Sequence, residues 1–209
     1  MNHKVNSVAN LHADAKALFD NDVVGSGDFS ADTIIFNLAE GIRILKDTWK
    51  GKDAGVQIEN VIVVHNAMVG IRNVLAELCV SSSKIAANYR DIQNSNGAGL
   101  EQLTVLNYTE KTRLEDYSDN RDTVDIVPGA KEGKTRIDNA NNNLPTFIEE
   151  VKKYYGAIMD NWTVGTGREN AQQAFNEFLS KSKSYEETLN SVSASIATAL
   201  ENYVFGSGN

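Results

Sequence analysis

The stretch that comes closest to a ligand-binding motif is VPGAKEGKTR, residues 127–136. Its Gly-Lys-Thr sequence would suit the phosphates of a nucleotide if another glycine stood five positions before Gly133. Pro128 occupies that position, and Gly129 comes one residue too late. A nucleotide site also needs an acidic strand to hold Mg²⁺, and no such strand is predicted here. We therefore expect a solvated turn that leads into a helix.

Metal-binding and nucleophilic patterns are also incomplete. Asp20 and Asp22 resemble the start of a calcium loop, but Ala31 occupies the twelfth position, where such loops carry a glutamate. No metal-ligand spacing links the linker aspartates or the histidines, which are Asp116, Asp119, Asp122, His3, His12 and His65. We expect these aspartates to be hydrated and His65 to be a polar flank of a helix. Cys79, the only cysteine, is expected to be a small buried hydrophobe. With no Gly-x-Ser-x-Gly elbow present, the sequence predicts a non-enzyme without metal or cofactor.

Charge and hydropathy narrow the possible partners. The chain has 209 residues with a net charge of −8, and it has no cluster of basic residues that would bind nucleic acid or anionic lipid. The first twenty residues lack the apolar core of a signal peptide, and no later stretch is predicted to span a bilayer. We therefore expect no nucleic-acid partner, no stable membrane insertion and no cleaved signal peptide.

Apolar residues recur at steps of three and four along most of the chain, which is the pattern of amphipathic helices. Two tryptophans, Trp49 and Trp162, each have apolar residues 4, 7, 11, 14 and 18 positions before them. After each tryptophan, a second stripe begins and continues to Ile92 in the first half and to Tyr203 in the second. Every position of the stripe after Trp162 lies one residue further from its tryptophan than the matching position of the stripe after Trp49. The chain therefore reads as a duplication with one inserted residue, and the predicted fold class is all-α.

The inserted residue lies in the corner between the two stripes of the second half. The first corner reads Trp49, Lys50, Gly51, whereas Gly165 stands three residues after Trp162. A chain that reverses between two helices needs a residue free to adopt positive φ, which Gly51 and Gly165 supply; Gly167 is an alternative in the second half. Each tryptophan is expected to close the core, and it is left open whether part of its indole is also exposed in a groove for a partner's helix.

A helix, a Trp-x-Gly turn and a longer second helix resemble the WXG family, the early-secreted-antigen-like substrates of bacterial type VII secretion. Trp49 and Gly51 match the motif directly; Trp162 matches it with Gly165 one position late. Members are usually single hairpins that pair into a four-helix bundle. The resemblance thus implies two tandem copies fused into one antiparallel four-helix bundle. The family's usual export signal, a tyrosine followed four residues later by Asp or Glu, is missing after Tyr89 and Tyr203.

The expected organisation has four segments. They are residues 1–27, an N-terminal helix and loop; 28–93, the first WXG-like hairpin; 94–136, a linker; and 137–209, the second hairpin. An antiparallel bundle requires a linker that runs back along it, but this linker is longer than necessary and is expected to fold locally. LTVLNY (103–108) and TVDIV (123–127) are predicted to pair as short strands.

Three functions remain open at this point. The first is a non-enzymatic type VII protein, a secreted substrate or an adaptor, whose partner is the secretion motor or a larger effector. It would act through helix-helix binding, with Trp49, Gly51, Trp162 and Gly165 as its recognition corners, and would be monomeric because its dimer is fused. The second is a helical, membrane-active toxin component. The third is a cytoplasmic helical adaptor or spacer with no secretion role.

Overall fold

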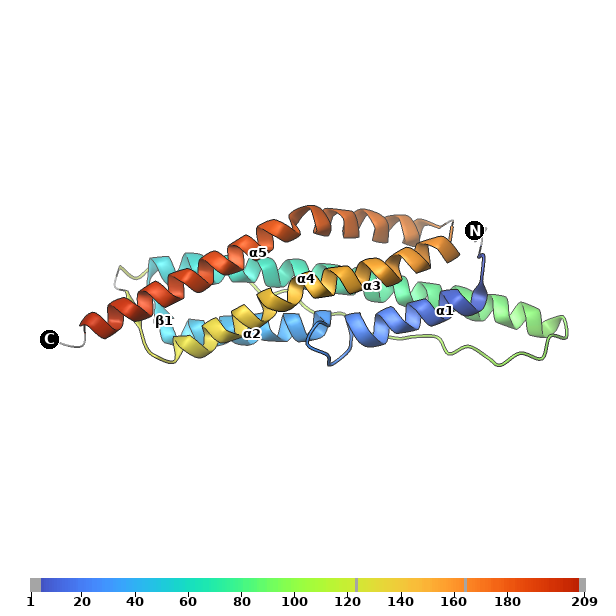
Figure 1. Ribbon diagram of the computed structural model, residues 1–209, viewed down its shortest axis with the longest axis horizontal. Coiled ribbons are helices and arrows are strands. Elements are labelled where there is room, and N and C mark those ends of the chain that lie inside the picture. The colour runs from blue at the N-terminus through green and yellow to red at the C-terminus, as the bar shows by residue number, and fades with distance from the viewer. Residues whose placement is uncertain (1–4, 123, 164, 207–209) are drawn as a thin grey trace. The chain divides into compact units, whose positions relative to one another are not determined.

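The computed structural model describes residues 5–122, 124–163 and 165–206 (Figure 1). Most of these residues are helical, and the all-α prediction is confirmed. The helices are α1 Val8–Ala17, a π-helix η1 Leu18–Val23, α2 Ala31–Thr48, α3 Lys52–Ser95, α4 Ala130–Asn161 and α5 Thr166–Gly206. Two short strands, β1 Trp49–Lys50 and β2 Asp125–Ile126, form an antiparallel pair.

The chain divides into two compact units, which we describe separately. The first unit comprises Met1–Asp32, Ile71–Lys111 and Thr146–Leu179, and the second comprises Thr33–Gly70, Thr112–Pro145 and Ser180–Asn209. Helices α2, α3, α4 and α5 contribute residues to both units. Each unit therefore contains residues from both repeats.

The apolar stripes form the core in both units. All ten positions that step back from the two tryptophans are buried: Ala31, Ile35, Leu38, Ile42, Leu45, Leu144, Ile148, Val151, Tyr155 and Ile158. On α3 the forward stripe is buried from Val61 to Ile85. Ile92 and Tyr203 at the predicted ends of the stripes are exposed by 58% and 40%. The apolar spacing of each stripe thus extends beyond the part of its helix that is buried against other elements.

Helices α2 and α4 approach closely in the second unit at two glycines. A Cβ atom on Gly133 would lie 3.0 Å from the side chain of Leu45, and one on Gly41 would lie 3.2 Å from the carbonyl oxygen of Gly133. The stretch that resembles a phosphate loop is therefore the first turns of α4, and its glycine allows the two helices to pack. Helix α4 begins at Ala130, so the linker ends before residue 136.

Helices α4 and α5 are antiparallel neighbours in each unit. In the second unit, the amide of Asn141 donates to Asn190 Oδ1 over 2.8 Å. In the first unit, the rings of Phe147 and Phe178 pack edge to face with centroids 6.4 Å apart. As α4 advances from Phe147 to Tyr155 in the first unit, its aromatic partner on α5 changes from Phe178 to Phe175, so the two helices run antiparallel there.

The linker does not form the predicted strand pair. Residues 98–121 contain no helix or strand, and β2 pairs instead with β1, with Ile126 opposite Trp49 and Asp125 opposite Lys50. The expected pairing of residues 103–108 with 123–127 is therefore wrong; of the second segment, residue 123 lies outside the described residues. The backbone groups of these segments have other partners: the N–H of Leu106 donates to Ser83 Oγ of α3 over 3.0 Å, the carbonyl oxygen of Thr104 lies 2.8 Å from His12 Nε2, and residues 125–126 pair with β1.

Helix α3 is more apolar than we expected from the sequence. By length and composition it could cross a membrane, with an 18-residue window of mean hydropathy 1.4, of which 61% is buried inside the structure. The core helix of a soluble protein meets the same criterion, because burial in protein and burial in lipid select similar side chains.

Candidate functional site

The first tryptophan corner joins α2 to α3. The backbone of Trp49 pairs with Ile126 across β1 and β2, and the Trp49 side chain is only 3% exposed. Gly51 has a φ of 111°, a conformation that other residues rarely adopt, so the chain reversal depends on it. The expectation that Gly51 takes positive φ is confirmed.

A buried carboxylate holds this corner in place. Asp119 Oδ2 accepts a hydrogen bond from the backbone N–H of Gly51 over 3.0 Å, and Asp119 Oδ1 accepts one from Arg121 Nε over 2.9 Å. The hydrogen bonds from Arg121 and from the Gly51 backbone hold the pKa of Asp119 well below its ordinary value. We expected Asp119 to be a hydrated linker residue, but the turn at Gly51 leaves an N–H group that it satisfies. Asp122 adds an ion pair to Lys52 at 2.5 Å.

Replacing Asp119 with Asn is expected to lower the melting temperature at neutral pH. The fold lowers the pKa of Asp119, so its stabilisation is fully present above the ordinary value of 3.8 and is lost as the pH falls below it. The melting curves of wild type and Asp119→Asn should therefore converge toward about pH 2, followed by circular dichroism. Asp116→Asn, at an exposed site in the same linker, is the control. Equal melting temperatures of Asp119→Asn and wild type at pH 7 would contradict this role.

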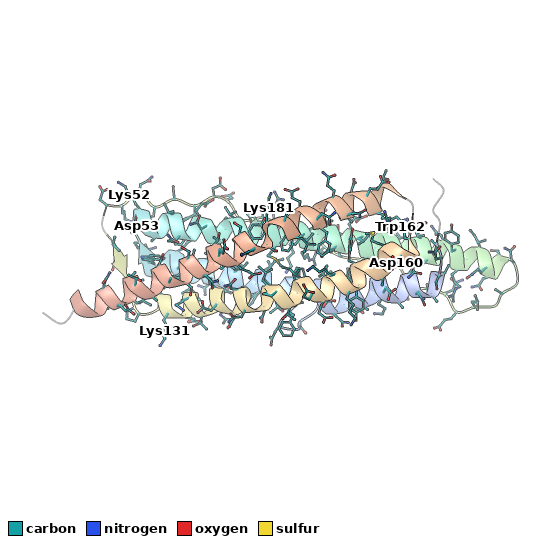
Figure 2. All side chains as sticks on the ribbon, turned by 45° about the horizontal axis from the view of Figure 1, so that its top comes forward. Lys52, Asp53, Lys131, Asp160, Trp162 and Lys181 are labelled. Carbon is teal, nitrogen blue, oxygen red and sulfur yellow. The ribbon has the colours of Figure 1, made fainter. Side chains whose placement is uncertain are left out.

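The second corner joins α4 to α5 in the first unit. Trp162, which Figure 2 labels, is 2% exposed, and its backbone forms an antiparallel bridge with Val5. Asn6 reinforces the bridge, since its backbone N–H donates to the carbonyl of Asn161 over 3.0 Å. Gly165 has a φ of 153°, as predicted for the turn. Gly167, the alternative turn residue, lies inside α5.

Both tryptophan backbones therefore pair with a short extended segment that precedes a helix elsewhere in the chain. Ile126 comes before α4, and Val5 comes before α1. The interpretation of Trp49 and Trp162 as core residues is confirmed. The alternative of an indole partly open in a groove is wrong for Trp162 within the part of the chain described. Trp49 does line a groove, but with almost no exposed surface.

That groove lies in the second unit and has a volume of about 800 Å³. Its walls come from three places: the strand β2 with the residue before it, the first turns of α3, and the C-terminal part of α5. Two of its lining residues each carry a polar atom that is buried behind the groove surface without a hydrogen-bond partner, Trp49 Nε1 and Gln57 Oε1. Buried polar atoms usually have partners, so this pair is unusual.

The linker is held on α3 by side-chain amides that act as a neighbouring strand would. In the first unit, Asn73 Nδ2 donates to the carbonyl of Lys111 over 2.9 Å, and Asn73 Oδ1 accepts from the Lys111 N–H over 3.0 Å. In the second unit, Asn66 forms the same two bonds with Leu114, over 2.9 and 2.8 Å. A single amide thus satisfies both backbone groups of one linker residue.

The spacing of these contacts follows from helix and strand geometry. Tyr117 continues the series, since its N–H donates to Glu59 Oε2 over 2.6 Å. The helix residues of the series are seven apart and the linker residues three apart: Glu59, Asn66 and Asn73 against Tyr117, Leu114 and Lys111. Seven helical residues rise about 10.5 Å, and three extended residues span about 10 Å, so the two repeats match.

Close contact between the linker and α3 also explains why a residue without a side chain is needed at position 55. A Cβ atom on Gly55 would lie 2.6 Å from the backbone nitrogen of Asp119. Gly55→Ala is therefore expected to destabilise the protein by about 1–3 kcal/mol, despite the better helix propensity of alanine. Gly156→Ala is the matched control, because a Cβ there would meet nothing within 4 Å, and it should stabilise by up to about 1 kcal/mol. Both changes can be measured by urea denaturation; equal effects would contradict the close contact.

A buried ion pair links α2, α3 and the linker in the first unit. The side chain of Arg72 is 4% exposed; its Nε donates to Asp32 Oδ1 over 2.9 Å, and its Nη1 donates to the carbonyl of Thr109 over 2.8 Å. Lys111 Nζ lies 3.6 Å from the same Asp32 oxygen. This cluster fixes the start of α2 against the linker, and the sequence analysis did not identify it.

The π-helix η1 buries a second carboxylate. Burial, followed by the nearby charge of Glu150, raises the pKa of Asp22 to about 6, while Lys153 opposes the shift. Asp22 Oδ2 has no hydrogen-bond partner. Asp22 therefore belongs to the interior of the first unit rather than to a hydrated cation loop.

Asp22→Asn is expected to stabilise the protein above pH 6. The folded state raises the pKa of Asp22 from 3.8, so keeping it ionised costs free energy that disappears as the pH falls through about 6 toward 3.8. Because the group retains some hydration, we expect a gain of about 1–2 kcal/mol at pH 8 and almost none near pH 4. Asp20→Asn in the same π-helix is the exposed control. A gain that is independent of pH would argue against this mechanism.

The remaining sequence candidates do not assemble into a site. Cys79 is buried as expected, and burial raises the pKa of its thiol. His65 is buried rather than flanking, with Nδ1 3.1 Å from Asn66 Oδ1. His12 Nε2 lies 2.8 Å from the carbonyl oxygen of Thr104, whereas His3 lies outside the described residues. No group of three or more potential metal ligands occurs within residues 5–122, 124–163 and 165–206.

Comparisons of this chain with family models, with curated proteins and with solved structures find no match. The candidate site must therefore be judged on the residues of this chain alone. Sequence reasoning found the two corners but missed Asp119, Arg72 and the asparagines of α3. The seven-residue spacing of Asn66 and Asn73 beside the apolar stripe was a readable signal, but nothing local indicates which segment they bind.

Proposed function

We propose that this chain is a non-enzymatic protein of the type VII secretion type, a WXG-like substrate or adaptor that binds other proteins. Its partner would be the secretion motor or a larger effector, and export would require no cleaved signal peptide. In this proposal the two repeats correspond to two WXG-like hairpins fused into one antiparallel four-helix bundle. Such a chain would be monomeric, because the two hairpins that form a dimer in the family would be joined in one polypeptide.

One observation carries the proposal: both tryptophan positions predicted from the repeat lie at turns between long helices. At each turn the tryptophan is buried and a glycine takes positive φ, at Gly51 and Gly165. The ten matched apolar positions before these tryptophans are also buried. If the Trp-x-Gly sequence were incidental, there would be no reason for a tryptophan turn with the same features to recur 113 residues further along the chain.

In the proposal the two corners are what a partner recognises. Because both indoles are buried, the tryptophans contribute to recognition indirectly, by stabilising the turns. Trp49 and Trp162 hold each turn closed, and Gly51 and Gly165 set its direction. A partner would then bind the surface that the turn creates and not the indole itself.

The proposal is tested by export from the source organism. Culture supernatants of the wild-type strain and of a strain that lacks the type VII motor ATPase are probed for this chain and for a cytoplasmic lysis marker. Appearance outside that depends on the motor, and returns when the motor gene is restored, supports a secreted substrate. Retention in both strains, together with failure of the chain to capture the motor from the same cells, would refute the proposal and leave an adaptor without a secretion role.

Helix α3 favours a second candidate, a membrane-active helical component. Its apolar window meets the length and hydropathy of a membrane span, so a hairpin that opened could insert. The net charge of −8 opposes binding to anionic lipid at neutral pH. Dye release from vesicles of phosphatidylcholine and phosphatidylglycerol, followed between about pH 4 and pH 8, tests this candidate. The absence of release at every pH would exclude it.

A further inference from the structure

The segment of residues 5–23, which contains α1 and η1, places a carboxylate in the interior of the first unit. Asp22 in η1 is only 6% exposed, and its Oδ2 is buried without a hydrogen-bond partner. An ionised carboxylate is stabilised by water or by donors on both of its oxygens, so a buried oxygen without a donor favours the neutral, protonated form. At neutral pH the closed structure must therefore hold a poorly solvated charge.

The groups that face Asp22 do not compensate for this burial. Glu150 of α4 adds a second negative charge, and Lys153 opposes it but also pairs with Glu150 at 3.8 Å. On α3, the neighbouring group is the thiol of Cys79, which is neutral because burial raises its pKa. Asp20 of η1 also lies near this thiol, and its side chain is 43% exposed. Burial and Glu150 thus prevail over Lys153, and the pKa of Asp22 is raised to about 6.

The helix that carries Asp22 has an unusual form and ends at an open loop. The N–H of Val24 donates to the carbonyl of Phe19, five residues back, over 2.9 Å. Such π-helical turns are rare and occur frequently at functional sites. Gly25 and Gly27 follow before α2 begins at Ala31, and a Cβ atom on Gly27 would meet nothing within 4 Å. The α1–η1 segment is therefore joined to α2 by a loop with space around it.

Few polar contacts attach the α1–η1 segment to the rest of the first unit. At its start, Val5 bridges to Trp162, and Asn6 Nδ2 donates to the carbonyl of Asp160 over 2.7 Å (Figure 2 labels Asp160 and Trp162). Along its length, His12 contacts the linker. Its remaining attachment is the burial of apolar side chains, which are Leu11, Ala15, Leu18, Phe19 and Val23. A segment held in this way can open as a unit before the whole protein unfolds.

We propose that the α1–η1 segment is a pH-dependent element that is closed on the first unit when Asp22 is protonated and opens more often when Asp22 is ionised. Opening carries the carboxylate into water and uncovers Cys79 and the side chains around it. The closed state binds one proton more than the open state between about pH 4 and pH 6, so the equilibrium constant for opening rises over this range and is level above it. This element goes beyond the proposed function and does not depend on whether the chain is exported.

The only cysteine of the chain is a built-in probe of this opening, because Cys79 is buried in the closed structure. The full chain and Asp22→Asn are labelled with dithiodipyridine, a disulfide that reacts with thiols at acid as well as neutral pH. The ratio of their labelling rates cancels the pH dependence of the thiol reaction itself, which both proteins share. We expect this ratio, wild type over variant, to rise about tenfold between about pH 4 and pH 7. A ratio that stays within about twofold over this range would overturn the proposal.

Substitutions around Asp22 test whether its charge is the cause. Glu150→Gln removes the like charge and should slow labelling at pH 7, whereas Lys153→Met removes the opposing charge and should accelerate it. Both effects should be smaller than that of Asp22→Asn, because these side chains are more exposed. Asp20→Asn is the matched control in the same π-helix and should leave the rate within about twofold. Changes of the same sign for Glu150→Gln and Lys153→Met would refute an electrostatic origin.

The dependence on urea separates this local opening from unfolding of the whole protein. Labelling of Cys79 at pH 7 should change little at low urea, because a local opening exposes little surface. A second protein, with Cys79→Ser and Val64→Cys, carries its only thiol in the part of α3 that belongs to the second unit, where Val64 is 1% exposed. Its labelling should rise steeply with urea, as global unfolding requires. Parallel urea dependences of the two thiols would show that Cys79 reports global unfolding and would refute the separate opening of the α1–η1 segment.

Discussion

Replacing Trp162 with alanine is expected to lower the free energy of unfolding by about 3–5 kcal/mol. Trp162 is among the largest fully buried side chains, and it closes the turn between α4 and α5. Its removal leaves a cavity at the residue whose backbone forms the bridge to Val5. Since domains of ordinary stability have only about 5–15 kcal/mol, the variant should be close to unfolding at 37 °C. Urea denaturation followed by circular dichroism measures the change.

Two control substitutions show whether the loss of stability comes from the buried Trp162 side chain or would follow from replacing any aromatic residue. Tyr203→Ala removes an aromatic side chain that is 40% exposed and should cost less than about 1 kcal/mol. Trp49→Phe should cost less than Trp49→Ala, because phenylalanine keeps most of the buried area and discards an N–H that has no partner. A loss below 1 kcal/mol for Trp162→Ala would mean that Trp162 does not close the core of the first unit.

Replacing Arg72 with alanine is the second change with a large expected effect, about 3–5 kcal/mol. The substitution leaves Asp32 without its main counter-charge and leaves the carbonyl of Thr109 without its donor. Lys111, at 3.6 Å, compensates only in part, because it is more than one-third exposed. We expect the melting temperature to fall and the linker to become more accessible to a protease, since Arg72 binds both α2 and the linker.

Arg43 is the matched control for Arg72. It also pairs with acidic side chains, Glu40 at 3.0 Å and Asp47 at 3.9 Å, but its side chain is 61% exposed. Arg43→Ala should therefore cost at most about 1 kcal/mol. A double variant, Arg72→Ala with Asp32→Ala, should recover part of the loss, because it removes the unpaired charge. Similar losses for Arg43→Ala and Arg72→Ala would show that the buried pair contributes no more than a surface one.

The helices and the two corners could be predicted from the sequence because their signals are local. A stripe with steps of three and four identifies a buried helix face without knowledge of what covers it, and positions such as Leu45 and Ile158 were buried as expected. Gly51 could be assigned to the turn because few residue types adopt its φ of 111°. The ends of the stripes were less predictable, since Ile92 continues the period but is exposed.

The linker could not be predicted in the same way. Its short apolar runs suggested a strand pair, but strand propensity does not specify which backbone groups will be paired. In the structure, the N–H of Leu106 donates to Ser83 of α3, Asn66 and Asn73 of α3 hold the neighbouring linker residues, and β2 pairs with β1. The polar residues of α3 that make these contacts resemble ordinary solvent-facing residues until the segment opposite them is known.

The sequence by itself determined the all-α class, the repeat, the buried faces of the helices and the glycines of the two turns. Only the tertiary structure decided the burial of Asp119, the pairing of Arg72 with Asp32, and the groove beside Trp49. The division has a physical reason. Helical periodicity and the φ of glycine are properties of neighbouring residues, whereas hydrogen bonds such as that from Gly51 to Asp119 join residues far apart in the chain and form only when packing brings them together.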